Sequence, residues 1–195
     1  MASIRVFSLM FRWQITLLLL MAVSSVGSFA ADTQPEFQFS LEQVKKEFSV
    51  HQRKESGTVF YECQIASCGQ GSTVSQHPQD STYPPDLNGL ESNFKDWLGG
   101  IDRAFPDKQI HGEVLRTSLG EFQNKSGESK LSYALELVRL SSENGSLGEI
   151  ETWWTIGFLT DGHGSMTFAS SSTERDMAWR NANGILAFTA SFTDK

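Results

Sequence analysis

The feature that most constrains the fold is a series of alternating apolar and polar residues in the second half of the chain. Leu131–Leu137 and Ile150–Phe158 alternate with a period of two, which is typical of half-buried strands. Ile110–Leu119 and Ser165–Ser170 have the composition of further strands. Short segments rich in Asn, Asp and Gly separate them. The pattern predicts consecutive antiparallel strands.

The first half of the chain predicts strands of lower regularity. Residues from Thr58 alternate up to Ile65 after a turn signal, so we expect a hairpin over Phe48–Ile65. Thr73–Ser75 is expected to be a short strand, and residues 76–86, with three prolines, an exposed connection. Phe37–Val50 mixes apolar and charged residues without a clean period.

Two segments have helical spacing of apolar residues. The first runs from Leu87 to about residue 104 and stops before Pro106. The second runs from about Glu174 to Phe192, and its expected core face holds Met177, Ile185, Phe188 and Phe192. We therefore expect an α+β fold, in which an antiparallel sheet of about six strands carries a mid-chain helix and a C-terminal helix.

The first thirty residues have the pattern of a secretory signal peptide. They contain no Asp or Glu, and they place Arg5 and Arg12 before the apolar run Ile15–Val23. Ser28 and Ala30 supply the small residues of a cleavage site, so we expect cleavage after Ala30 and a single domain over 31–195. The alternative, an uncleaved membrane anchor, requires a longer apolar run.

Composition narrows the classes of partner. The formal net charge is −7, and no block of like charge occurs, which argues against nucleic-acid binding. No segment after the signal is apolar for long enough to span a bilayer. The four His are dispersed and no paired metal-ligand spacing is present, so neither a metal nor another cofactor is expected.

Export changes the interpretation of the two cysteines. An oxidising compartment allows disulfides to form, so we expect Cys63 and Cys68 to pair and to hold a bend. Catalytic thiol chemistry is the alternative, but it commonly uses two intervening residues, and four separate this pair.

The order of the elements resembles the PsbP/Mog1-like α/β sandwich, including bacterial periplasmic DcrB-like proteins. The resemblance covers residues 87–192: helix residues Trp97–Ile101 lead into strand Glu113–Leu119, and the chain closes with Ile185–Phe192. It implies the architecture and a Gram-negative periplasm, with secretion as the alternative. Because such folds serve as docking modules in unrelated systems, it also lowers the expectation of catalysis.

Motifs for catalysis are weak. His163-Gly164-Ser165 lacks the Gly-x-Ser-x-Gly pattern and fits a turn better. Asp161 and His163 lack the further donors that a metal site requires. No catalytic residue is predicted.

Trp153 is the best candidate for a binding residue. Strand parity places Trp154 on a core face and leaves Trp153 with Glu149 and Glu151 on the opposite face. A Trp beside acidic residues is typical of a partner-docking site. The alternative is that a helix covers that face and Trp153 is packed.

These observations favour an exported, non-enzymatic binding or accessory protein of the bacterial cell envelope. Its expected partner is an envelope protein or a small ligand. A small periplasmic hydrolase is the second hypothesis. The third is an inhibitor of an exogenous enzyme that presents the Cys63–Ser72 loop.

Overall fold

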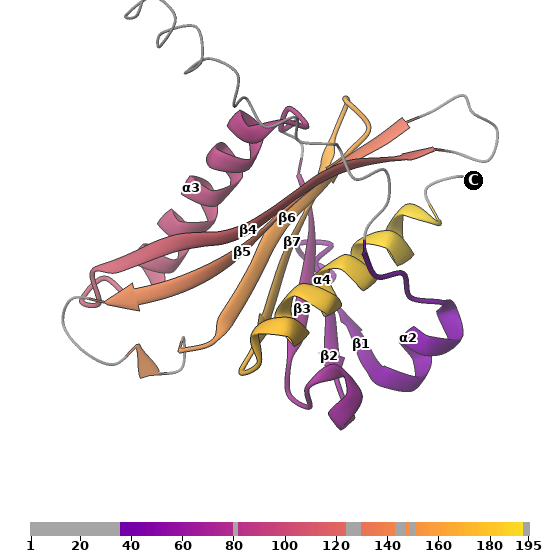
Figure 1. Cartoon of the computed structure of the whole chain (residues 1–195), viewed down its shortest axis with the longest axis horizontal. Coiled ribbons are helices and arrows are strands. Elements are labelled where there is room, and N and C mark those ends of the chain that lie inside the picture. Colours follow the sequence, from indigo (N-terminus) through magenta and orange to yellow (C-terminus); the bar gives the residue numbers. More distant parts are fainter. Residues whose placement is uncertain (1–35, 80–81, 124–129, 143–146, 149–150, 193–195) are drawn as a thin grey trace, which may run out of the picture. The chain divides into compact units, whose positions relative to one another are not determined.

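The computed structural model describes residues 36–79, 82–123, 130–142, 147–148 and 151–192 (Figure 1). The expected signal peptide lies outside the described residues. The elements, in chain order, are α2 (Leu41–Glu47), β1 (Phe48–Gln52), β2 (Val59–Cys63), the 3-10 turn η1 (Ala66–Cys68), β3 (Thr73–Gln79), α3 (Leu87–Ala104), β4 (Ile110–Gln123), β5 (Lys130–Ser142), β6 (Trp153–Thr160), β7 (Ser165–Ser172) and α4 (Arg175–Ala190).

Seven strands in the described part of the chain form one sheet, in the order β1-β2-β3-β7-β6-β5-β4. Every neighbouring pair is antiparallel. The predicted α+β fold class is therefore confirmed, with seven strands where the sequence predicted about six. The order places β7 beside β3, which joins the N-terminal strands to the later meander.

The N-terminal hairpin forms as predicted, with Phe48 opposite Cys63. The prediction for the following strand was too short, because β3 continues to Gln79 through Pro78. Pairing of β3 with β2 ends at Gln76, whereas its pairing with β7 runs along the whole strand, from Thr73 to Gln79. Pro78 lacks a main-chain N–H, so it is tolerated where one side of the strand has no ladder partner.

The structure contains one helix that the sequence did not predict, α2. Its N-cap is Ser40, whose Oγ accepts a hydrogen bond from the Gln43 N–H at 3.1 Å. Of the helix residues, Val44 and Glu47 are buried. A seven-residue helix with this pair as its inward face has no apolar stripe to detect.

Helix α3 matches its predicted range. Asp86 is its N-cap, and the Asp86 carboxylate accepts a hydrogen bond from the Gly89 N–H at 3.0 Å. Leu87, expected in the core stripe, is 56% exposed because it is the first residue of the helix and lies outside the packed part. No helix in the described part of the chain has both the length and the apolarity to cross a membrane.

Helices α3 and α4 pack on opposite faces of the sheet, so each face has its own core (Figure 1). The α4-side core joins Leu135 and Phe168 of the sheet to Trp179 and Ile185 of α4. On the α3 side, Ile156 packs near Trp97 and its neighbours on the helix. Alternation along β5, β6 and β7 thus supplies apolar residues to both faces.

Helix α4 is buried on almost every side, unlike a surface helix with a single apolar stripe. A Cβ on Gly184 would lie 2.5 Å from the Phe39 ring, so glycine permits this close approach. Phe192, expected on the core face, is 46% exposed because the helix ends at Ala190. Its ring contacts Phe188, with the centroids 4.8 Å apart.

Candidate functional site

A cleft of about 230 Å³ lies between α3 and the part of the sheet formed by β3 and β7. Helix α3 packs on β4, β5 and β6, and the cleft opens beside it. The polar and aromatic side chains that line it come from the floor strands, from the connection before α3 and from α3 itself: Ser75, His77, Gln79, Thr167, Tyr83, Asn93, Asp96 and Trp97.

The floor is built by the register of β3 with β7. Ser75 is opposite Ala169, and His77 is opposite Thr167. The Ser75 hydroxyl donates to the Ala169 carbonyl, and the Thr167 hydroxyl donates to the His77 carbonyl, both at 3.2 Å. Because each hydroxyl hydrogen is donated to a main-chain carbonyl, the hydroxyl oxygens of Ser75 and Thr167 act as acceptors toward a ligand.

A hydroxyl beside the floor holds the His77 ring. The Thr58 Oγ1 atom lies 2.7 Å from His77 Nδ1 and 2.7 Å from the Ser56 hydroxyl. Thr58 is buried, with 8% exposure. This contact fixes the orientation of the His77 imidazole. Because Thr58 is buried, its hydroxyl is not accessible to a substrate in the cleft.

The wall is one face of α3. Asn93, Asp96 and Trp97 are spaced at i, i+3 and i+4, which places them together on a helix surface. The Tyr83 hydroxyl donates to Asp96 Oδ2 at 2.8 Å. The Trp97 ring packs on the Trp154 ring of β6, with the ring centroids 5.3 Å apart.

Asn93 is the unusual member of the wall. It is 5% exposed, and its Oδ1 atom has no hydrogen-bond partner among the described residues. A buried carbonyl oxygen without a partner costs about 1–3 kcal/mol. The Oδ1 atom itself is covered, so it gains a hydrogen bond only where a ligand donor reaches into the wall of the cleft.

A buried carboxyl group lies under α3, on strand β5, which β6 separates from the cleft strand β7. Glu136 of β5 is 7% exposed, faces α3 beside Ile156, and its Oε2 atom has no partner among the described residues. Burial, and secondarily the negative charge of Glu91, raise the pKa of Glu136. Glu91 is itself paired with Lys95 at 2.6 Å on the exposed side of the helix.

The raised pKa predicts a pH-dependent loss of stability. The folded state binds the Glu136 proton more tightly than the unfolded state, so this contribution is complete below the unfolded pKa, about 4.3, and is lost as pH rises through the folded pKa. We expect Glu136→Gln to lose less stability than the wild type from about pH 4 to pH 8. Urea unfolding across this range measures the difference. Parallel curves for the two proteins would contradict the prediction, and Glu113→Gln, at an exposed position on β4, is the control.

The structure places Trp153 and Trp154 on opposite faces, in agreement with the predicted parity. Trp153 packs against the α4-side core, and Trp154 packs against the α3-side core. Trp153 is half-buried and lies opposite Arg139 on β5. The α4-side core therefore covers part of the sheet face on which docking at Trp153 was predicted.

Of the two acidic residues expected beside Trp153, Glu149 lies outside the described residues. Glu151 is exposed, and its Oε1 atom accepts a hydrogen bond from the Leu147 N–H at 2.8 Å. Glu151, Arg139 and Trp153 line a separate shallow depression. Docking at Trp153 stays a prediction. Its surroundings include the cationic side chain of Arg139 as well as the expected acidic residues.

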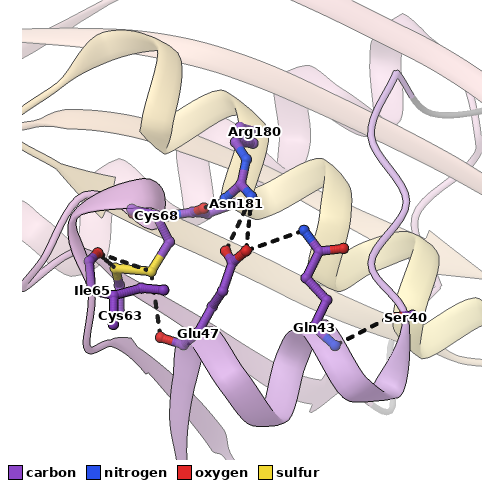
Figure 2. Close-up of polar contacts among 8 residues, drawn as sticks. All are labelled: Ser40, Gln43, Glu47, Cys63, Ile65, Cys68, Arg180 and Asn181. Carbon is purple, nitrogen blue, oxygen red and sulfur yellow. Dashed lines mark hydrogen bonds and ion pairs between the residues drawn. A yellow bond between two sulfur atoms is a disulfide. The ribbon is translucent and has the colours of Figure 1, made fainter.

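Cys63 and Cys68 are joined in a disulfide, and both are buried. The loop they close is fixed to α4, because the Asn181 side-chain amide donates to the Cys68 carbonyl at 2.8 Å (Figure 2). Asn181 is itself fully buried. Disulfides of this kind are typical of proteins that fold outside the reducing cytosol.

Figure 2 also shows an ion pair that links α2 to α4 beside this loop. Arg180 Nη2 lies 3.0 Å from Glu47 Oε2, and the two side chains are 17% and 10% exposed. Gln43 donates to the same carboxylate at 3.3 Å. The Arg180 guanidinium also lies over the Phe39 ring, 4.7 Å from its centroid. The polar contacts thus hold α2 and the disulfide loop on the C-terminal helix.

The segment with the most catalytic-looking sequence is a turn. The Asp161 carboxylate accepts hydrogen bonds from the N–H groups of His163 and Gly164 at 2.8 and 2.9 Å. These main-chain contacts lower the pKa of Asp161. Across the described residues, no group of three or more His, Cys, Asp or Glu is arranged to hold a metal ion.

Sequence reasoning missed the cleft because part of its floor, His77 and Gln79, fell in a segment interpreted as an exposed connection. Ser75, His77 and Gln79 alternate with a period of two and would predict one strand face. Pro78 obscured that signal. The spacing of Asn93, Asp96 and Trp97 was available, but nothing in the sequence indicates that β3 lies opposite this helix face.

The similarity found to known proteins is one of overall structure. No protein-family model matches the chain. No curated protein matches it either. Among solved structures, the chain is similar to the solution structure of cyanobacterial PsbP (CyanoP) from Synechocystis, with 14% identity and a TM-score of 0.40. The match covers 74% of this chain and 90% of that chain. No argument about the fold or the site rests on this match.

Proposed function

We propose that this chain is an exported, non-enzymatic binding protein of the bacterial cell envelope, located in the periplasm. Its binding site is the cleft between α3 and strands β3 and β7. The observation that carries the proposal is Asn93, whose buried Oδ1 atom lacks a partner among the described residues at the wall of this cleft. Export is supported by the signal-like first thirty residues and by the Cys63–Cys68 disulfide.

The chemistry of the lining favours binding over hydrolysis. A hydrolase needs an accessible nucleophile next to a base. In the cleft, the hydroxyls of Ser75 and Thr167 donate to main-chain carbonyls. The hydroxyl that contacts the His77 ring is that of Thr58, which is buried. Fixed acceptors around a small cleft are suited to hold a polar group in one orientation.

The proposal is tested with a set of small polar compounds that includes amines, amides, alcohols, carboxylates and sugars. Binding is followed by the NMR shifts of the Trp97 indole N–H and of main-chain amides on β3. We expect at least one class to shift these signals in the wild type. Ser75→Leu, which fills the floor, should abolish the shifts.

Thr73→Leu is the matched control, because Thr73 is on the same face of β3 but does not line the cleft. It should bind like the wild type. Failure of every class to shift cleft signals, or shifts that persist in Ser75→Leu, would overturn the proposal. Ester hydrolysis by the wild type that disappears in His77→Ala would replace it with the hydrolase hypothesis.

A further inference from the structure

The geometry points to a cationic nitrogen group, an alkylammonium or a guanidinium, as the ligand that this cleft accepts. The inference rests on the proposed function, because it names the chemistry of what binds there. It is carried by the direction of the hydrogen bonds in the lining, by the charge at the wall and by the size of the space.

Three lining residues contribute hydrogen-bond acceptors. Asn93 contributes a buried carbonyl oxygen without a partner among the described residues. Ser75 and Thr167 have used their hydroxyl hydrogens on the main chain, so their oxygens accept. A ligand that meets these groups must bring several N–H or O–H donors. Ammonium and guanidinium groups bring three or more donors and no acceptor.

The charge at the wall selects a cation among such donors. Asp96 accepts from the Tyr83 hydroxyl at one oxygen, Oδ2, and its exposed carboxylate borders the cleft. Among the lining residues of the described cleft, His77 is the one side chain that can become positive, and Thr58 holds its Nδ1 atom. The chain as a whole has a formal charge of −7, which attracts cations over longer distances.

The size and the aromatic wall agree with a small cationic head. A volume of about 230 Å³ is below the range of about 300–1,000 Å³ that is typical of sites for drug-sized ligands. It suits one head group on a short alkyl stem. Trp97 and Tyr83 contribute aromatic surface, and Trp is the ring that attracts cations best.

The test compares four probes with short unbranched alkyl stems: n-butylammonium, n-butylguanidinium, n-butanol and butyrate. Chemical-shift titration of the full mature protein, followed at the Trp97 indole and the β3 amides, gives an apparent Kd for each. We expect at least one cation to bind about tenfold more tightly than the alcohol, and butyrate to bind worst. Cation affinity should fall as salt is added.

Two variants connect this preference to the wall. Asp96→Asn keeps an oxygen for Tyr83 but removes the charge, and it should reduce cation affinity about tenfold with little effect on butanol. Asn93→Leu removes the buried acceptor and should weaken the cations as well, which provides a second test if Asp96→Asn is poorly folded. Asp102→Asn, on the same helix but outside the lining, should bind like the wild type.

The source of the cation is distinguished by blocked tripeptides with a central Lys or Arg. Binding of these peptides as tightly as the butyl probes identifies a basic side chain as the ligand, and binding of the butyl probes alone identifies a small free amine. Either result supports a cationic nitrogen group. Tighter binding of butanol or butyrate at the cleft would overturn the inference and leave the proposed binding function standing. If no probe of this series and no compound of the broader set shifts the cleft signals, both the cation inference and the proposed binding function are overturned.

Discussion

Replacing Arg180 with Ala is expected to lower the free energy of unfolding by about 3–5 kcal/mol, because it leaves the Glu47 carboxylate buried without its counter-charge. The loss includes the contact of the guanidinium with the Phe39 ring. Denaturant unfolding of the oxidised protein at neutral pH measures it. The same comparison for Glu47→Gln should give a loss of the same sign.

Two controls separate the ion pair from general damage. Lys95→Ala breaks an exposed pair with Glu91 and should leave stability nearly unchanged. The double replacement of Glu47 and Arg180 by Met should cost much less than the sum of the single changes, because neither charge is then left alone. Additive losses in the double variant would mean that the two side chains do not act as a pair.

The second large effect is expected at Trp154. Trp154→Ala should cost about 3–5 kcal/mol, because it removes the ring that packs between the sheet and Trp97. Its Nε1 atom is buried without a partner among the described residues, so Trp154→Phe should retain most of the stability. Thermal and urea unfolding measure both losses.

Trp153→Ala is the informative comparison, since Trp153 is half-buried like Trp154 but lies on the opposite face of the sheet. A smaller loss of stability with a clear loss of capture of envelope proteins would support docking at Trp153. Losses comparable to those of Trp154→Ala, with capture falling only as folded protein is lost, would make Trp153 a packing residue. Arg139→Ala, opposite Trp153 on β5, tests whether the neighbouring cation contributes to the same surface.

Local sequence patterns predicted the elements wherever each element faces its core in a regular way. The alternation of β5 and β6 and the stripe of α3 are such cases. The range of α3 was predicted closely, whereas β5 extends to Ser142, beyond the predicted Leu131–Leu137, and β6 begins at Trp153, after the predicted start at Ile150. The short helix α2 was missed because its contribution to the core is Val44 and a paired Glu47. Helix α4 was found, but its face was predicted incompletely, because small residues such as Ala182 are buried along with the large ones.

The candidate cleft depended on information that no local pattern contains. Asn93 reads as an ordinary polar helix residue, and only the packing of α3 beside β3 and β7 makes its carbonyl a buried acceptor. His77 likewise gains its position from Thr58, nineteen residues earlier. Pairing between distant strands decides such sites, and one sequence gives little evidence of which strands pair.

The pairing of β3 with β7 also determines when the cleft comes into existence. The two floor strands are about ninety residues apart, as the hydrogen bond from Ser75 to Ala169 spans 94 positions. Loop closure over that distance makes such contacts late in folding. A chain whose last strand has not yet paired therefore has no complete floor for a ligand. A ligand that binds in the cleft therefore stabilises only the completely folded domain, because incompletely folded states lack the site.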